Sequence, residues 1–274
     1  MKYGNRRVLM AGAMVLFLLF LTGVAVSGWI FKEAAGVTDF SRKNLPPCAA
    51  YPFGTDFMGR DMFFRTLAGL SMSIRLGLLT AAISALIAFL LGLSAAVLGK
   101  WADGLVCGVI DLMMGIPHIL LLILISFACG RGFFGVVLGI SLTHWTSLAR
   151  LIRGEVMQLK ARPYIQIAGK LGHGSLWTAF HHMTPHLLSQ FVTGLVLLFP
   201  HAILHEASMT FLGFGLAPEE PAVGIILSES MKYLVMGKWW LALFPGLFLV
   251  AVVLMFHGLG QGLMLLLDPE SVHQ

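Results

Sequence analysis

The sequence predicts an all-α membrane protein with six transmembrane helices. Of its 274 residues, 58% are hydrophobic and 11% are charged, and the mean hydropathy is +0.87. Soluble domains carry about a quarter charged residues. Several apolar runs reach the length of about 20 residues that one helix needs to cross a bilayer core. Backbone groups inside a bilayer must be hydrogen-bonded within the chain, so these runs are expected to be helices.

The first expected span covers residues 8–31, which carry no charge and directly follow Arg6 and Arg7. A cleaved signal peptide is the alternative, but its apolar region is only about 7–15 residues long. We therefore interpret this run as a retained anchor. The second span is expected at residues 76–99, just after Arg75.

The third expected span, residues 104–130, is broken by Asp111 and Pro117. The last three spans are expected at residues 132–149, 186–208 and 241–267. This division gives an N-terminus with its helix at 1–31, a loop at 32–68, a core of five helices at 69–267 and a tail at 268–274.

Loop charges predict the orientation, because short loops rich in Lys and Arg stay in the cytoplasm. The loop at 150–185 has five basic residues and one acidic residue, whereas the loop at 209–240 has three acidic and two basic residues. Both termini and the 150–185 loop are therefore expected in the cytoplasm, and the 32–68 and 209–240 loops outside. The 32–68 loop has five basic residues, which argues against this weakly, but four acidic residues accompany them.

The composition excludes several classes of function. The net charge of +5 follows from basic residues gathered in particular loops, so it indicates membrane topology and no nucleic-acid partner. Cys48, Cys107 and Cys129 are too few and scattered for a disulfide framework or a cysteine zinc site. Gly99-Lys100 and Gly169-Lys170 lack the other residues of a Walker A motif. With no nucleophile–base pair apparent either, an enzyme has no support beyond the number of histidines.

The segment 163–176 has helical spacing, with Ile165, Ala168 and Leu171 on one side. Pro163 is suited to the first helical turn, and Gly172 is expected to end or bend the helix. The residues alone favour a basic interfacial helix lying on anionic lipid.

Ionisable residues inside the expected spans are candidates for a pathway, since such residues are rare in membranes and by default functional. Asp111 and Glu206 are the acidic candidates. His201 and His205 are spaced i, i+4 and therefore share one helix face. Paired imidazoles of this kind bind Ni, Zn or Cu, and hydrogen bonding to the backbone or to hydroxyls is the alternative. The sequence adds His118 and His144 as further metal candidates.

Several motifs resemble those of the permease subunits of ABC transporters, in particular the peptide/nickel permeases. Residues 51–61, Y-P-F-G-T-D-F-M-G-R-D, resemble the family's H-P-[FL]-G-T-D-x-x-G-R-D stretch. Residues 206–215, E-A-S-M-T-F-L-G-F-G, resemble its E-A-x-L-S-F-L-G-L-G signature. Further matches are Asp111 with Pro117, A-R-L-I-R at 149–153, L-A-L-F-P-G at 241–246 and L-D-P at 267–269.

The segment that begins at Gln166 is similar to the family's coupling loop, EAA-x3-G-x9-I-x-L-P. The resemblance implies that Gln166, Ala168, Gly172 and Pro185 contact a separate ATPase subunit. Three positions depart from the pattern: Gln166 replaces Glu, Ile167 replaces Ala and Thr184 replaces Leu.

The resemblance implies a type I ABC importer permease fold with a cytoplasmic coupling helix, in the inner membrane and surrounded by lipid. Its implied partners are a homologous second permease, two ATPase subunits that bind ATP and Mg, and an extracytoplasmic solute-binding protein. This chain is expected to hold no cofactor and not to be an enzyme. The nickel branch of the family is similar at His144-Trp145 and at His201 with His205, which predicts nickel or a nickel chelate as the substrate. A dipeptide or oligopeptide is the alternative; a membrane metalloenzyme and a structural scaffold are more remote.

Overall fold

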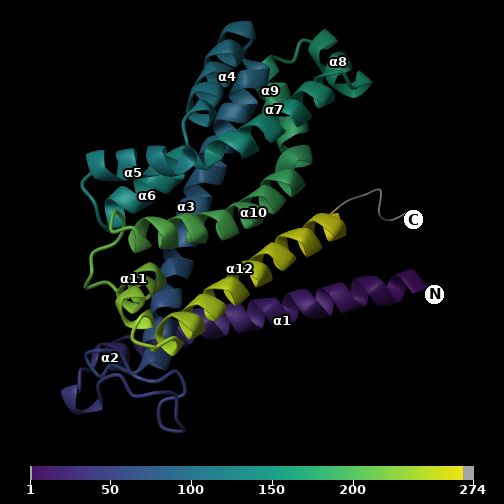
Figure 1. The fold of residues 1–274 in the computed structure, drawn as a ribbon. Helices are drawn as coiled ribbons and strands as arrows, with labels where there is room; N and C mark the ends of the chain where they lie inside the picture. Colours follow the sequence, from purple (N-terminus) through teal and green to yellow (C-terminus); the bar gives the residue numbers. More distant parts are fainter. Residues whose placement is uncertain (1, 268–274) are drawn as a thin grey trace.

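The computed structural model describes residues 2–267, which form an almost wholly helical chain (Figure 1). Its helices are α1 (Lys2–Ile30), α2 (Lys32–Gly36), α3 (Met62–Val97), α4 (Lys100–Gly115), α5 (His118–Ala128), α6 (Phe133–Thr143), α7 (Trp145–Lys160), α8 (Pro163–Lys170), α9 (Ser175–Thr178), α10 (Thr184–Phe211), α11 (Val223–Leu234) and α12 (Trp240–Leu267). A 3-10 turn covers Phe40–Arg42, and a π-helical turn, Ala179–Met183, joins α9 to α10.

The expected all-α membrane fold is confirmed. Five continuous helices among the described residues are long and apolar enough to cross a membrane. A sixth candidate is the pair α4 and α5, which passes the same test only when it is taken together. The expected tail at 268–274 lies outside the described residues.

The third expected span differs from a simple interrupted helix, because α4 and α5 meet at an angle of 101°. Pro117 lacks a backbone N–H and forces the preceding residue out of the helical region. Ile116 accordingly has φ −93° and ψ 136°, and α5 begins at His118. The chain then returns along α6, which packs against α5.

Several helices are longer than the apolar runs that predict them. α3 begins at Met62 rather than at residue 76, and the Asp61 side chain caps it by accepting a hydrogen bond from the Phe63 N–H at 2.8 Å. α6 and α7 form one continuous stretch, Phe133–Lys160, which extends past residue 149. Charged residues such as Arg65 and Arg153 end the apolar run in the sequence. The helix nevertheless continues through them, because they form ion pairs with acidic side chains.

α3 is the central helix and packs against α1, α7 and α10 (Figure 1). Small residues allow these close contacts, since lipid offers no hydrophobic drive for helix association. A Cβ on Gly92 would lie 2.6 Å from the Ala149 carbonyl oxygen of α7. A Cβ on Gly28 would lie 2.0 Å from the Leu67 carbonyl oxygen, which fixes α1 against α3 in the same way.

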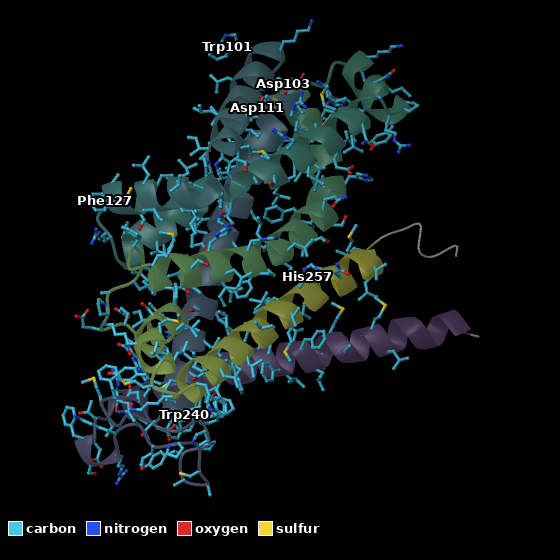
Figure 2. All side chains as sticks on the ribbon, in the orientation of Figure 1. Trp101, Asp103, Asp111, Phe127, Trp240 and His257 are labelled. Atoms are coloured by element: carbon cyan, nitrogen blue, oxygen red, sulfur yellow. The ribbon has the colours of Figure 1, made fainter. Side chains whose placement is uncertain are left out.

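The segment at 37–61 and α11 form an ordered cap over one end of α3 and α12, which the hydropathy pattern does not predict. A buried ion network holds the cap together. Arg65 Nη1 lies 2.8 Å from Asp56 Oδ2, and Arg65 Nη2 lies 2.7 Å from Glu229 Oε2 on α11. Arg60 joins the same Asp56 oxygen at 2.7 Å. Trp240 is labelled beside this cap in Figure 2, at the start of α12.

Candidate functional site

The predicted coupling segment forms the helix α8, which begins at Pro163 and ends just before Leu171. Gly172 follows with φ +89°, a left-handed conformation that glycine adopts without strain. The His173 N–H bonds to the Ala168 carbonyl at 3.2 Å, and the Gly172 N–H bonds to the Gly169 carbonyl at 3.1 Å. These two bonds make a Schellman motif, which ends the helix and turns the chain toward α9.

One face of α8 is buried and the other is exposed. Ile165 and Ala168 are buried, as the spacing predicts. Leu171 does not join them: it lies beyond the helix end and is 73% exposed. Gln166 and Gly172 are exposed, as is Pro185 in the first turn of α10. The exposed large apolar side chains between residues 163 and 180 are Tyr164, Ile167, Leu171, Leu176, Trp177 and Phe180.

A cavity of about 670 Å³ lies between the α4–α5 bend, the α6–α7 junction and α10. Its volume falls within the range of about 300–1,000 Å³ that is typical of small-molecule sites. The cavity is lined by Met113, Met114, Gly115, Ile116, Pro117, His118, Thr143, His144, Thr146, Ser147, Leu198, His201 and His205.

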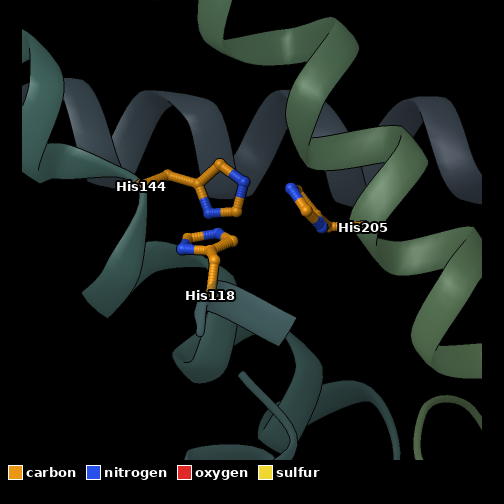
Figure 3. A group of neighbouring side chains, drawn as sticks. All are labelled: His118, His144 and His205. Carbon is orange, nitrogen blue, oxygen red and sulfur yellow. The ribbon is translucent and has the colours of Figure 1, made fainter. Parts of the chain in front are cut away.

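Three histidines converge at this cavity, each from a different element (Figure 3). His118 is the first residue of α5, His144 lies between α6 and α7, and His205 lies on α10. One ring nitrogen from each residue can be chosen so that all three nitrogens lie within 4.8 Å of one another. The ring centroids are 4.7 Å apart for His118–His144 and for His118–His205, and 5.0 Å apart for His144–His205.

Hydrogen bonds fix the ring of His144. Its Nδ1 lies 3.1 Å from the Ile140 carbonyl oxygen, and this oxygen can only accept. Nδ1 therefore carries the proton, and Nε2 has a free lone pair. Nε2 is buried and has no hydrogen-bond partner among the described residues.

The structure changes which histidines form the metal candidate. His201 and His205 both line the cavity, as their shared helix face predicts, but His201 is not part of the three-residue group. His118 and His144 take its place. Their spacing gives no signal for this grouping, because the residues meet through the 101° bend and the contact of α10 with α5 and α6.

The two acidic pathway candidates lie away from this cavity. Asp111 is exposed on α4, where Figure 2 labels it, and its Oδ1 lies 2.8 Å from Arg150 Nη2 on α7. Glu206 is fully buried and accepts hydrogen bonds from Ser73 at 2.6 Å and from Thr210 at 3.0 Å. Glu206 thus joins α3 to α10, and neither acid is among the described residues that line the cavity.

Residues 88–270 match the family model for the binding-protein-dependent transport system inner membrane component, and this match covers more than half of the chain. The chain belongs to this permease family. The permease is therefore a multi-pass membrane subunit of an ABC importer and not an enzyme.

Similar proteins support the same assignment over almost the whole permease. It is 32% identical to the probable D,D-dipeptide transport system permease protein DdpC of Escherichia coli, over 94% of this chain and 86% of that protein. It is 29% identical to the dipeptide transport system permease protein DppC of Bacillus subtilis, over 97% and 83%. It is 32% identical to the glutathione transport system permease protein GsiD of Pectobacterium atrosepticum, over 93% and 85%.

Proposed function

We propose that the permease forms half of a pathway that imports short peptides or peptide-like solutes, driven by ATP hydrolysis on partner subunits. The names of its relatives carry this proposal: they are permeases of dipeptide, D,D-dipeptide and glutathione transport systems. A cavity of about 670 Å³ is large enough for a solute of this size. A homologous second permease supplies the other half, and a solute-binding protein delivers the solute.

The exposed apolar surface of the coupling segment is the docking site for an ATPase subunit in this proposal. Ile167 is 55% exposed and Leu171 is 73% exposed. Exposed apolar side chains next to polar residues are typical of a protein–protein contact. Gln166, Ala168, Gly172 and Pro185 shape this surface, with Ala168 anchoring α8 from its buried side.

The proposed orientation places both termini and α8 in the cytoplasm, and α11 with the cap outside. Cys48 and Cys129 are exposed, so labelling requires a cysteine-free background. In intact cells we expect Glu219→Cys to react with an impermeant thiol reagent and Lys170→Cys to react only after lysis. The reverse labelling pattern would show that the argument from loop charges is wrong.

Nickel, as an ion or a chelate, is a second candidate for the transported substrate. The specific observation in its favour is the group of His118, His144 and His205 on the cavity wall. Imidazole is a ligand that suits nickel, copper and zinc.

Uptake in cells with and without the gene distinguishes the two candidates. We expect a labelled dipeptide to accumulate only when the gene is present, and unlabelled dipeptide to compete. The opposite result would make nickel the substrate. In that case radioactive nickel would accumulate only in cells with the gene, and dipeptide uptake would be the same in cells with and without it. Loss of ATP should stop either uptake, because the energy comes from the partner subunits.

A further inference from the structure

We infer that His118, His144 and His205 form a binding site for one divalent late first-row transition metal ion, with its remaining coordination positions open to the cavity. This inference rests on the proposed function in one respect: the proposed function makes the cavity part of a solute pathway. Figure 3 shows the three rings turned toward a common centre.

The nitrogen positions are compatible with coordination of one ion. The three pairs of ring planes are inclined at 72°, 59° and 74°, so the rings are not stacked face to face. Metal–imidazole bonds of about 2.1 Å place the ligand atoms of a tetrahedral site about 3.4 Å apart. The nitrogens lie within 4.8 Å of one another, so binding requires the rings to close by at most about 1.4 Å.

His144 is already oriented as a metal ligand. Metal-binding histidines usually donate their second ring N–H to a carbonyl or a carboxylate, which fixes the ring and its tautomer. The Ile140 carbonyl serves His144 in this way, and Thr143 Oγ1 also lies 3.2 Å from Nδ1. The buried Nε2 is left with a lone pair and no partner among the described residues. A buried polar atom without a protein partner is unfavourable, and this nitrogen is available to a ligand in the cavity that His144 lines.

A purely structural role explains the other two rings poorly. In the described part of the chain, the rings of His118 and His205 have no hydrogen bond that would hold them in place. They are half-buried at the cavity wall, and each packs against the other and against the ring of His144. Two such rings packed beside His144 gain little from their position unless all three share a ligand.

The donor set defines the class of metal and suggests how it meets the solute. Three neutral nitrogens favour Ni²⁺, Cu²⁺ and Zn²⁺ over Mg²⁺ and Ca²⁺, which prefer oxygen ligands. Glu206, the acid next to His205, is bonded to Ser73 and Thr210 instead. With no described carboxylate in the group, the charge of the ion favours an anionic donor from the solute. The carboxylate and amine of a peptide-type solute provide such donors, so a metal-bound peptidic chelate fits both the site and the relatives.

The experiment uses the complete importer, purified without a polyhistidine tag and without nucleotide. NiCl₂ is titrated by calorimetry, and CoCl₂ is used to record the absorption bands of a metal with nitrogen ligands. His201→Ala is a matched control, since His201 lines the same cavity one helical turn from His205 but lies outside the group. Excess MgCl₂ is present throughout and should not compete.

We expect the wild type to bind one more Ni²⁺ per permease than the His205→Ala variant does, or to bind it at least about tenfold more tightly. His118→Ala should show the same loss, and His201→Ala should keep the wild-type affinity and cobalt spectrum. Equal binding by wild type and His205→Ala, or equal losses in His201→Ala and His205→Ala, would overturn the site. Any Ni²⁺ bound by the histidines of the coupling segment is the same in all variants, so it does not affect the difference in Ni²⁺ binding between them.

Failure of this site and failure of the proposed import are separate results. If cells take up dipeptide but wild type and His205→Ala bind nickel equally, the metal-site proposal is refuted and the import proposal stands. If the purified importer binds the metal at this site but cells take up neither dipeptide nor nickel, the metal-site proposal stands and the import proposal is refuted.

Discussion

Replacing Gly172 with leucine is expected to abolish solute-stimulated ATP hydrolysis by the assembled importer while the permease still inserts into the membrane. Gly172 has φ +89°, and a left-handed conformation costs a residue with a Cβ about 1–2 kcal/mol. Among residues 2–267 nothing lies within 4 Å of a Cβ at this position, so no contact there offsets that strain. The strained turn would displace Leu171 and α9, which form the proposed ATPase contact.

Gly169→Leu is the matched control for this experiment. Gly169 lies in α8 without a left-handed φ, and a Cβ there also meets nothing within 4 Å. This variant adds the same side chain to the same segment without backbone strain, so it should couple better than Gly172→Leu. The measurement is ATP hydrolysis by the reconstituted importer with and without the solute-loaded binding protein. Wild-type stimulation in Gly172→Leu would refute the assignment of the coupling segment.

The second large effect is expected at the buried ion network of the cap. Arg65→Met removes one of the two arginines that contact Asp56 and the nearer of the two that contact Glu229, so Arg60 alone remains with both acids. Removing one member of a buried ion pair costs about 3–5 kcal/mol when the remaining charge is left uncompensated. Because Arg60 still compensates Asp56, we expect a loss at the lower end of this range. The side chains of Arg65 and Asp56 are only 9% and 3% exposed, which places them in that class. A loss of this size lowers the melting temperature of a chain of this length by roughly 10 °C.

Arg42→Met provides the comparison within the same cap. Arg42 also forms an ion pair, with Asp39 at 2.8 Å, but the two side chains are 54% and 36% exposed. An exposed pair contributes only about 0–1 kcal/mol. Thermal unfolding in detergent, followed by tryptophan fluorescence, should therefore separate the two variants clearly. Equal melting temperatures would mean that the cap does not depend on the buried network.

The sequence predicted those features that depend on local composition. The apolar runs predicted the number of candidate spans, and Pro163 and Gly172 predicted both ends of the coupling helix. The start of α3 and the end of α7 were missed because the predicted spans stop at Arg75 and Arg150, whereas both helices continue past these residues. Arg75 Nε donates a hydrogen bond to the Ser71 carbonyl, and Arg150 pairs with Asp111.

The histidine group needed tertiary information. His201 and His205 share a helix face, and this local relation was predicted from their spacing. His118 joins His205 only because Pro117 turns the chain between α4 and α5, and no spacing rule gives the angle of such a turn. The cap over α3 was missed for the same reason, since the ion pairs that join Arg60 and Arg65 to Glu229 link residues more than 160 positions apart.

The continuous stretch of α6 and α7 joins the cavity to the coupling segment. His144 lies at the start of α7. Two residues, Ala161 and Arg162, separate the end of α7 at Lys160 from the start of α8. The 16 residues of α7 make a rod of about 24 Å, held to α4 by Asp103–Arg153 and Asp111–Arg150. We expect a continuous helix that reaches both sites to couple them. If nucleotide binding to the ATPase subunits changes the affinity of the cavity for its ligand by some factor, the ligand must change the affinity for nucleotide by the same factor.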